Sequence, residues 1–174
     1  MSIVLVLAGC ADKTTGIASR DFGAATTTTP VRPKNIDLNG KQHCLLAPTD
    51  WADVSIEKDG TLEDRTDDPQ GVECAYNTNI GYFGFLFNIT DGIGLWTDPR
   101  VAEKIDPVTP VLGYPAFQRA HGTNSGRCDI IVDVSEGQAL DVFASIDHRS
   151  APRLPPKCET ARKLAELALT ALNQ

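Results

Sequence analysis

The clearest pattern along the chain is the alternation of apolar and polar residues. Residues 82–90, 128–134 and 140–146 each place an apolar side chain at every second position. A period of two over this length is typical of half-buried β-strands. Residues 72–77 and 116–120 are weaker strand candidates. Ser135-Glu136-Gly137-Gln138 predicts a hairpin between the last two strong strands, because Gly137 tolerates a positive φ. Short turns join neighbouring strands, so we expect a mainly antiparallel sheet.

A different period marks the C-terminus. After Pro155-Pro156, apolar residues recur at steps of three and four from Ala161 to Leu172, which predicts an amphipathic helix packed on the sheet. A shorter helix is predicted over 45–54, with Pro48 in its first turn. Residues 57–73, which are rich in Asp and Glu, are interpreted as a solvated loop. Strands between two helices indicate an α+β domain, with a short N-terminal helix and a C-terminal helix on an antiparallel sheet.

Composition limits the class of protein. The 174 residues are 41% hydrophobic, which fits one domain and a tail. No stretch reaches the roughly 18–20 apolar residues of a membrane span, which excludes a multi-pass membrane protein. The formal net charge of −7 argues against nucleic acid as a partner, because the general field repels phosphates.

The cysteines predict disulfides. Once Cys10 is set aside, four cysteines remain, and no C-x-x-C pair suggests a metal site. Four cysteines allow three pairings. We favour Cys44–Cys74 and Cys128–Cys158, since both close loops of similar span and each joins a predicted helix start to a predicted strand.

The N-terminus resembles a targeting signal. Leu7-Ala8-Gly9-Cys10 resembles the bacterial lipobox, and the resemblance implies that Cys10 is acylated and anchors the mature chain in the membrane. The alternative is a cysteine that follows an apolar start by chance. Signal peptides have a cationic start and a longer apolar region, so we expect the true start to lie upstream of Met1.

We therefore divide the chain into a truncated signal peptide (1–9), a lipidated and disordered Thr/Pro tether (10–35) and one disulfide-stapled domain (36–174). Whether the tether threonines are glycosylated stays open.

The order of these motifs resembles the lipoproteins of actinobacterial cell envelopes that contain a domain of unknown function. The resemblance is carried by the lipobox, the tether and a set of later motifs, namely Cys44-Leu45-Leu46, Cys74, Gly113-Tyr114-Pro115-Ala116, Cys128, Gly137-Gln138-Ala139-Leu140, Cys158 and Ala165-Glu166-Leu167-Ala168. It implies an extracytoplasmic location and an α+β domain stapled by disulfides. It implies no catalytic residues.

Catalytic motifs give little support to an enzyme. There is no H-E-x-x-H, G-x-S-x-G or glycine-rich phosphate loop, so we predict no metal, no cofactor and no catalytic residue. A hydrolase whose residues converge only in space stays the third hypothesis. It rests on polar residues near strands that are able to pair: Asp129, Asp133, Asp141, Asp147 and His148.

Aromatic residues give the only site hypothesis. Phe83, Phe85, Phe87, Trp96 and Tyr114 would line an apolar pocket, although core packing explains the same residues. The function predicted first is a non-catalytic binding or interaction module, anchored through Cys10 on the extracytoplasmic face of the cell membrane. An envelope protein would be its partner. The alternative is a sensor or carrier of a small apolar ligand or lipid.

Overall fold

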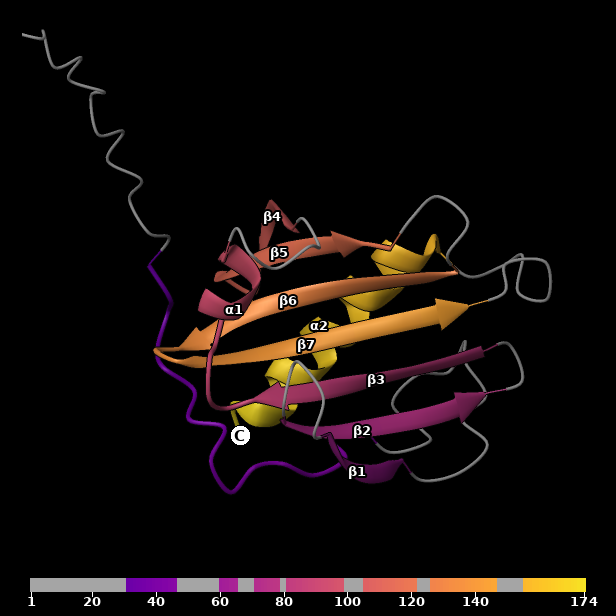
Figure 1. The fold of residues 1–174 in the computed structure, drawn as a ribbon, viewed down its shortest axis with the longest axis horizontal. Helices are drawn as coiled ribbons and strands as arrows, with labels where there is room; N and C mark the ends of the chain where they lie inside the picture. Colours follow the sequence, from indigo (N-terminus) through magenta and orange to yellow (C-terminus); the bar gives the residue numbers. More distant parts are fainter. Residues whose placement is uncertain are drawn as a thin grey trace, which may run out of the picture.

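The fold is an antiparallel sheet covered by one long helix. It was derived from a computed structural model that describes residues 31–46, 60–65, 71–78, 81–98, 105–121, 126–146 and 155–174. These residues form seven strands in the order β1-β2-β3-β7-β6-β5-β4 (Figure 1). The strands are β1 (Thr61–Arg65), β2 (Gly71–Thr78), β3 (Gly81–Asn88), β4 (Ile105–Val111), β5 (Tyr114–Ala120), β6 (Arg127–Ser135) and β7 (Gln138–Ile146). Two meanders, β1-β2-β3 and β4-β5-β6-β7, are joined by the pairing of β3 with β7.

Two helices lie on opposite faces of this sheet. Helix α2 (Lys157–Leu172) packs along one face against β6 and β7, and touches β4 more sparsely (Figure 1). Helix α1 (Gly94–Thr97) is a single turn on the other face, close to β6. The predicted α+β fold with an antiparallel sheet and a packed C-terminal helix is confirmed.

The core lies between α2 and the sheet. Period-two alternation turns the apolar side chains of β3, β6 and β7 toward the helix, where they join one buried cluster. On α2 the buried positions recur at three- and four-residue steps and include three alanines, which permit a close approach to the strands. These positions are Ala161, Leu164, Ala165, Ala168, Leu169 and Leu172.

Two disulfides hold separate parts of this fold together. Cys44 bonds to Cys74 of β2, and Cys128 of β6 bonds to Cys158 in the first turn of α2. Their Cα–Cα distances are 5.3 and 5.2 Å, in the normal range. These are the two pairs that the cysteine spacing favoured.

The segment before β1 packs along the end of the β6–β7 hairpin. The backbone N–H of Ile36 donates to the carbonyl of Val134 (3.0 Å), and that of Leu38 donates to the Gln138 side chain (2.6 Å). Ile36 and Leu38 are both buried. The polypeptide is therefore fastened to the domain well before the first strand begins.

Some elements differ from the sequence-based prediction. The solvated loop predicted for residues 57–73 was wrong in part, because this stretch contains β1 and the start of β2. Strand β1 is exposed along most of its length, so its sequence does not alternate between apolar and polar residues. Strand β4 and helix α1 were not predicted at all. Of the predicted helix over 45–54, Leu45 and Leu46 lie in irregular chain, and residues 47–54 lie outside the described residues. The predicted signal peptide (1–9), Cys10 and the predicted tether up to residue 30 also lie outside them.

Candidate functional site

The face of the sheet opposite α2 carries charged residues on its central strands. Strand alternation that points apolar side chains toward α2 leaves Arg119, Asp129 and Asp141 on this second face. The register sets Arg119 directly opposite Asp129, and sets Ile131 opposite Asp141. A charged cluster therefore crosses three adjacent strands.

Arg119 is the centre of this cluster. Its Nε donates to Oδ2 of Asp129 at 2.8 Å, and Nη2 contacts the same oxygen. Nη2 also donates to Oδ2 of Asp141 at 3.2 Å. Above the guanidinium, the ring of Trp96 lies with its centroid 4.2 Å away, a cation–π distance. One cation thus links two carboxylates and an indole.

Asp129 accepts hydrogen bonds from further partners. Nε of Arg127 donates to its Oδ1 at 2.7 Å, and Nε2 of His121 lies 2.8 Å from its Oδ2. The Asp129 side chain is fully buried, whereas those of Arg127 and His121 are each about a quarter exposed. The cluster therefore extends from a fully buried centre to a partly solvent-exposed rim.

Burial and charge separate the two carboxyl groups. Burial is the largest influence on Asp141 and raises its pKa to about 7; the charge of Asp129 adds to this, while Arg119 and Arg127 oppose it. For Asp129, burial also acts upward. The hydrogen bond from Arg127 and the charges of Arg119 and Arg127 outweigh it, and the pKa falls below the ordinary carboxyl value. One carboxyl therefore stays ionised while the other exchanges a proton near neutral pH.

Two buried polar atoms beside Arg119 lack partners. Among the described residues, Oδ1 of Asp141 and Nε1 of Trp96 have no hydrogen bond. Asp141 is 1% exposed and Trp96 is 5% exposed. An unpaired buried acceptor disfavours the ionised carboxylate, in agreement with the raised pKa of Asp141.

Aromatic rings form the rim of the cluster. The Arg127 guanidinium lies 4.3 Å from the ring centroid of Phe143, and the Tyr82 ring meets Phe143 edge-on at 5.8 Å. Gly84 leaves room for Phe143, because a Cβ at this position would lie 2.7 Å from its ring. The rim is thus closely packed around a guanidinium.

The aromatic residues proposed as a pocket do not line one space. Phe83, Phe85, Phe87 and Tyr114 are buried in the core between the sheet and α2. Trp96 lies on the opposite face with Ile131 and Ala139. The sheet separates these two groups, so one cavity does not contain all five residues.

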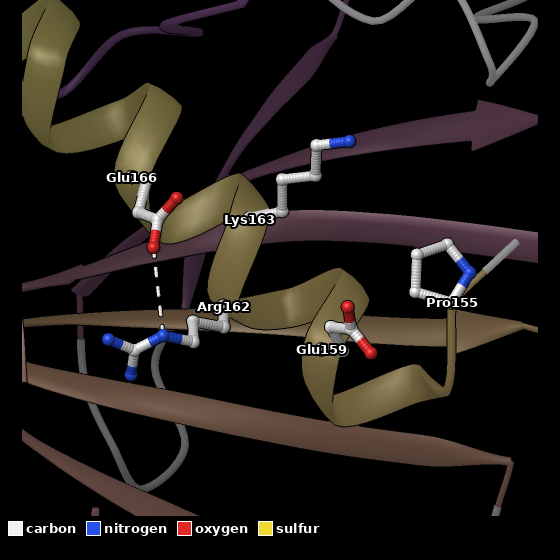
Figure 2. A pocket seen from close by; sticks show the side chains of 5 residues that line it. All are labelled: Pro155, Glu159, Arg162, Lys163 and Glu166. Atoms are coloured by element: carbon white, nitrogen blue, oxygen red, sulfur yellow. Dashed lines mark ion pairs between the residues drawn. The ribbon is translucent and has the colours of Figure 1, made fainter. Parts of the chain in front are cut away.

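A surface recess lies on the outer side of α2. It has a volume of about 310 Å³ and is lined by Pro155, Glu159, Arg162, Lys163 and Glu166 (Figure 2). Arg162 and Glu166 form an ion pair at 3.6 Å across it. The Arg162 guanidinium also donates to the carbonyls of Thr109 and Pro110 on the edge strand β4, at 2.6 Å each. This recess is charged and open, unlike a site for a lipid tail.

The remaining candidate residues are dispersed. Asp133 pairs with Arg32 at 2.8 Å rather than with the cluster. His43 is exposed, and Asp147 and His148 lie outside the described residues. In the part of the chain that the structure describes, no group of His, Cys, Asp and Glu is able to hold a metal ion.

The sequence pointed to part of this site only. Asp129 and Asp141 were named as strand residues able to converge, but Arg119, His121 and Trp96 were not connected with them. The available signal was charge at alternate positions of otherwise apolar strands, such as Asp129 between Cys128 and Ile130.

A family model for a protein of unknown function, DUF3558, matches residues 5–171. The chain belongs to the DUF3558 family. The DUF3558 match spans the Cys10 segment, all four disulfide cysteines and the whole charged cluster. No curated protein and no solved structure matches the chain. The two disulfides of this DUF3558 member indicate an oxidising, extracytoplasmic location. None of the described helices is long and apolar enough to cross a membrane.

Proposed function

We propose that this chain is a lipid-anchored, extracytoplasmic binding or interaction module of an actinobacterial cell envelope and performs no catalysis. The observation that carries the proposal is a domain with two disulfides behind the sequence Leu7-Ala8-Gly9-Cys10. Disulfides persist outside the cytoplasm, and an acylated Cys10 would hold the domain at the membrane. The formal net charge of −7 supports a domain that is displayed away from anionic lipid.

The charged cluster supports a non-catalytic role. A general acid or base has to reach the substrate within hydrogen-bond distance. The side chains of Asp129 and Asp141 are 0% and 1% exposed, and both accept hydrogen bonds from Arg119. Burial therefore keeps both carboxyl groups out of the reach of a substrate in this structure.

The position of the aromatic residues supports recognition at the surface. Phe83, Phe85 and Phe87 pack against α2 as part of the core, and the recess on α2 is lined by charged side chains. A carrier of apolar ligands needs an apolar cavity of roughly 300 Å³ or more. A polar surface suits an envelope protein better as the partner.

Lipidation is tested in the native host, with the protein expressed from its own locus so that any upstream leader is retained. Cells are fed an alkynyl palmitate, and the wild type is compared with Cys10→Ala and with Thr14→Ala as a matched control. We expect label and membrane association in the wild type and the control, and loss of both in Cys10→Ala. An unlabelled wild-type chain in the soluble fraction would contradict the anchor.

The oxidised state of the four domain cysteines is tested on protein taken from intact cells. The protein is denatured and treated with a maleimide–polyethylene glycol before and after reduction. We expect four additional modified thiols only after reduction, at positions 44, 74, 128 and 158. Modification of these four cysteines without reduction would place the domain in a reducing compartment.

Catalysis is tested with ester, phosphate and glycoside chromogenic substrates. We expect wild-type rates equal to those without protein. Turnover that disappears in Asp141→Asn, with folding retained by circular dichroism, would identify the cluster as a hydrolase centre instead.

A further inference from the structure

Helix α1 is attached to the sheet at two points. At its base, Oδ1 of Asn88 accepts hydrogen bonds from the backbone N–H groups of Thr90 (3.1 Å), Asp91 (3.0 Å) and Gly92 (3.4 Å). At its other end, the Trp96 ring lies on the Arg119 guanidinium. A single helical turn has little stability of its own. Its seating therefore depends on contacts with the sheet, namely the packing of Trp96 against Ile131 and Ala139 and its contact with Arg119.

The Arg119 guanidinium in turn depends on Asp141. Their contact at 3.2 Å joins β5 to β7 across β6. The charged groups that face Asp141 are Arg119 from β5, Asp129 and Arg127 from β6, and Glu73 from β2. Glu73 is itself paired with Arg65 of β1. The charge of Asp141 is therefore disfavoured by two other carboxylates and favoured by two arginines.

We propose that the protonation of Asp141 controls the seating of α1, so that residues 91–98 act as a pH-responsive latch over the charged cluster. The latch concerns the domain alone and goes beyond the proposed function. It would operate equally in a lipidated or an unlipidated chain.

The neutral carboxyl fits the closed form. When Asp141 carries its proton, Arg119 faces one buried carboxylate, Asp129, and remains a cation available to the Trp96 ring. The burial of Oδ1 without a donor then costs less, because a neutral carboxyl is less strongly hydrated than a carboxylate.

The ionised carboxylate disfavours the closed form. When Asp141 loses its proton to water, a second buried anion faces Arg119, and Oδ1 requires hydration. In the proposed open form, Trp96 has moved off the guanidinium and water hydrates this oxygen. The pKa of about 7 places the change in a range that an extracytoplasmic domain experiences. A proton binds the closed form more tightly, so a rise in pH shifts the population toward the open form.

His121 is the competing explanation for a change near neutral pH. Its Nε2 lies 2.8 Å from Asp129, and imidazole commonly exchanges a proton in this range. The test therefore has to separate Asp141 from His121.

The experiment uses the full chain with Trp51→Phe, which leaves Trp96 as the only tryptophan. Trp96 emission is recorded from pH 5 to pH 9 in this background, and again with Asp141→Asn or His121→Gln added. We expect a shift to longer wavelength with a midpoint near pH 7. The shift should vanish in Asp141→Asn and persist in His121→Gln.

Hydrogen exchange of residues 91–98 in the chain with both tryptophans retained provides a second readout. At pH 8 we expect at least tenfold faster exchange in the wild type than in Asp141→Asn, and equal rates at pH 5.

Two results would overturn the proposal. One is an emission shift that persists in Asp141→Asn and disappears in His121→Gln, which would assign the change to the histidine. The other is emission and exchange of residues 91–98 that do not differ between wild type and Asp141→Asn at either pH.

Discussion

Arg119 reaches Asp141 across the full width of a strand. Arg119 is on β5 and Asp141 is on β7, with β6 between them, and the guanidinium Nη2 lies 3.2 Å from the carboxylate Oδ2. The contact is diagonal, because the residue directly opposite Arg119 is Asp129. A long side chain thus connects next-nearest strands inside the molecule. This connection makes the stability of the sheet depend on pH and on a single cation.

Asp141 should make the domain less stable at higher pH. Its pKa is about 7 in the folded protein against an ordinary value of 3.8, so the folded state retains a proton that the unfolded state has lost. The resulting stabilisation is complete below about pH 4 and is lost as the pH rises through 7. The two values differ by about 3 units, and at 1.4 kcal/mol per unit the change amounts to about 4 kcal/mol.

Asp141→Asn should remove this dependence. In urea unfolding we expect the variant to exceed the wild type by about 4 kcal/mol at pH 8, and by only about 1–2 kcal/mol at pH 5, where the folded state still holds the proton. Glu136→Gln, at an exposed turn position, removes the same charge without burial and serves as the control. Equal wild-type and Asp141→Asn stabilities at pH 8 would refute the assignment.

Removal of Arg119 should be far more damaging than removal of an outer arginine. Arg119→Ala leaves Asp129 without one of its arginines, and deletes the cation beneath Trp96. The loss of one partner from a buried ion pair costs about 3–5 kcal/mol. Arg65→Ala breaks the pair with Glu73 at a partly exposed site and should cost at most about 1 kcal/mol.

Urea unfolding at pH 8 measures both variants. The double variant Arg119→Ala/Asp141→Asn should recover part of the loss, because one stranded carboxylate is then neutral. Similar losses in Arg119→Ala and Arg65→Ala would show that the cluster contributes little.

The sequence predicted the elements whose burial creates a period. Strands β3, β6 and β7 have one face on α2, and α2 has one face on the sheet, so apolar residues recur at steps of two and of three to four. Strand β1 has no such signal, since its side chains are largely exposed. Strand β4 contains Pro107 and Pro110, which argue against a central strand, and it is indeed an edge strand.

The charged cluster was harder to predict for a geometric reason. Alternation shows that Asp129 and Asp141 point away from α2, but their proximity depends on the register of β6 with β7. The contact with Arg119 depends further on the pairing of β5 with β6. Helix α1 is only one turn long, too short to produce a period. The sequence therefore indicated the carboxylates and not the cation and indole that accompany them.

Gly84 should tolerate no side chain. A Cβ there would lie 2.3 Å from the carbonyl oxygen of Cys74 and 2.7 Å from the Phe143 ring, and a backbone oxygen has little freedom to move. We expect Gly84→Ala to cost about 1–3 kcal/mol or more. Gly94→Ala is the matched control, because a Cβ in that position meets nothing within 4 Å.

In α1 the added methyl group of Gly94→Ala should stabilise the chain by about 0.5–1 kcal/mol, since alanine favours helix over glycine. Thermal unfolding of both variants decides the matter. A Gly84→Ala melting temperature at or above that of the wild type would show that β2 and β3 are less closely packed than described.

The two disulfides should contribute equally to stability. Each joins cysteines separated by 30 residues, and in the chain-entropy account loops of equal length restrict the unfolded chain equally, by about 3–4 kcal/mol each. Urea unfolding of Cys44→Ala/Cys74→Ala and of Cys128→Ala/Cys158→Ala compares them. Cys74 and Cys128 are both fully buried, so the alanine pairs leave similar defects. Hydrogen exchange should separate the variants, with faster exchange in the first turn of α2 only when Cys158 is replaced. Stability losses that differ by more than about 1.4 kcal/mol, a tenfold difference in the folding equilibrium constant, would contradict loop closure as the main source of stabilisation.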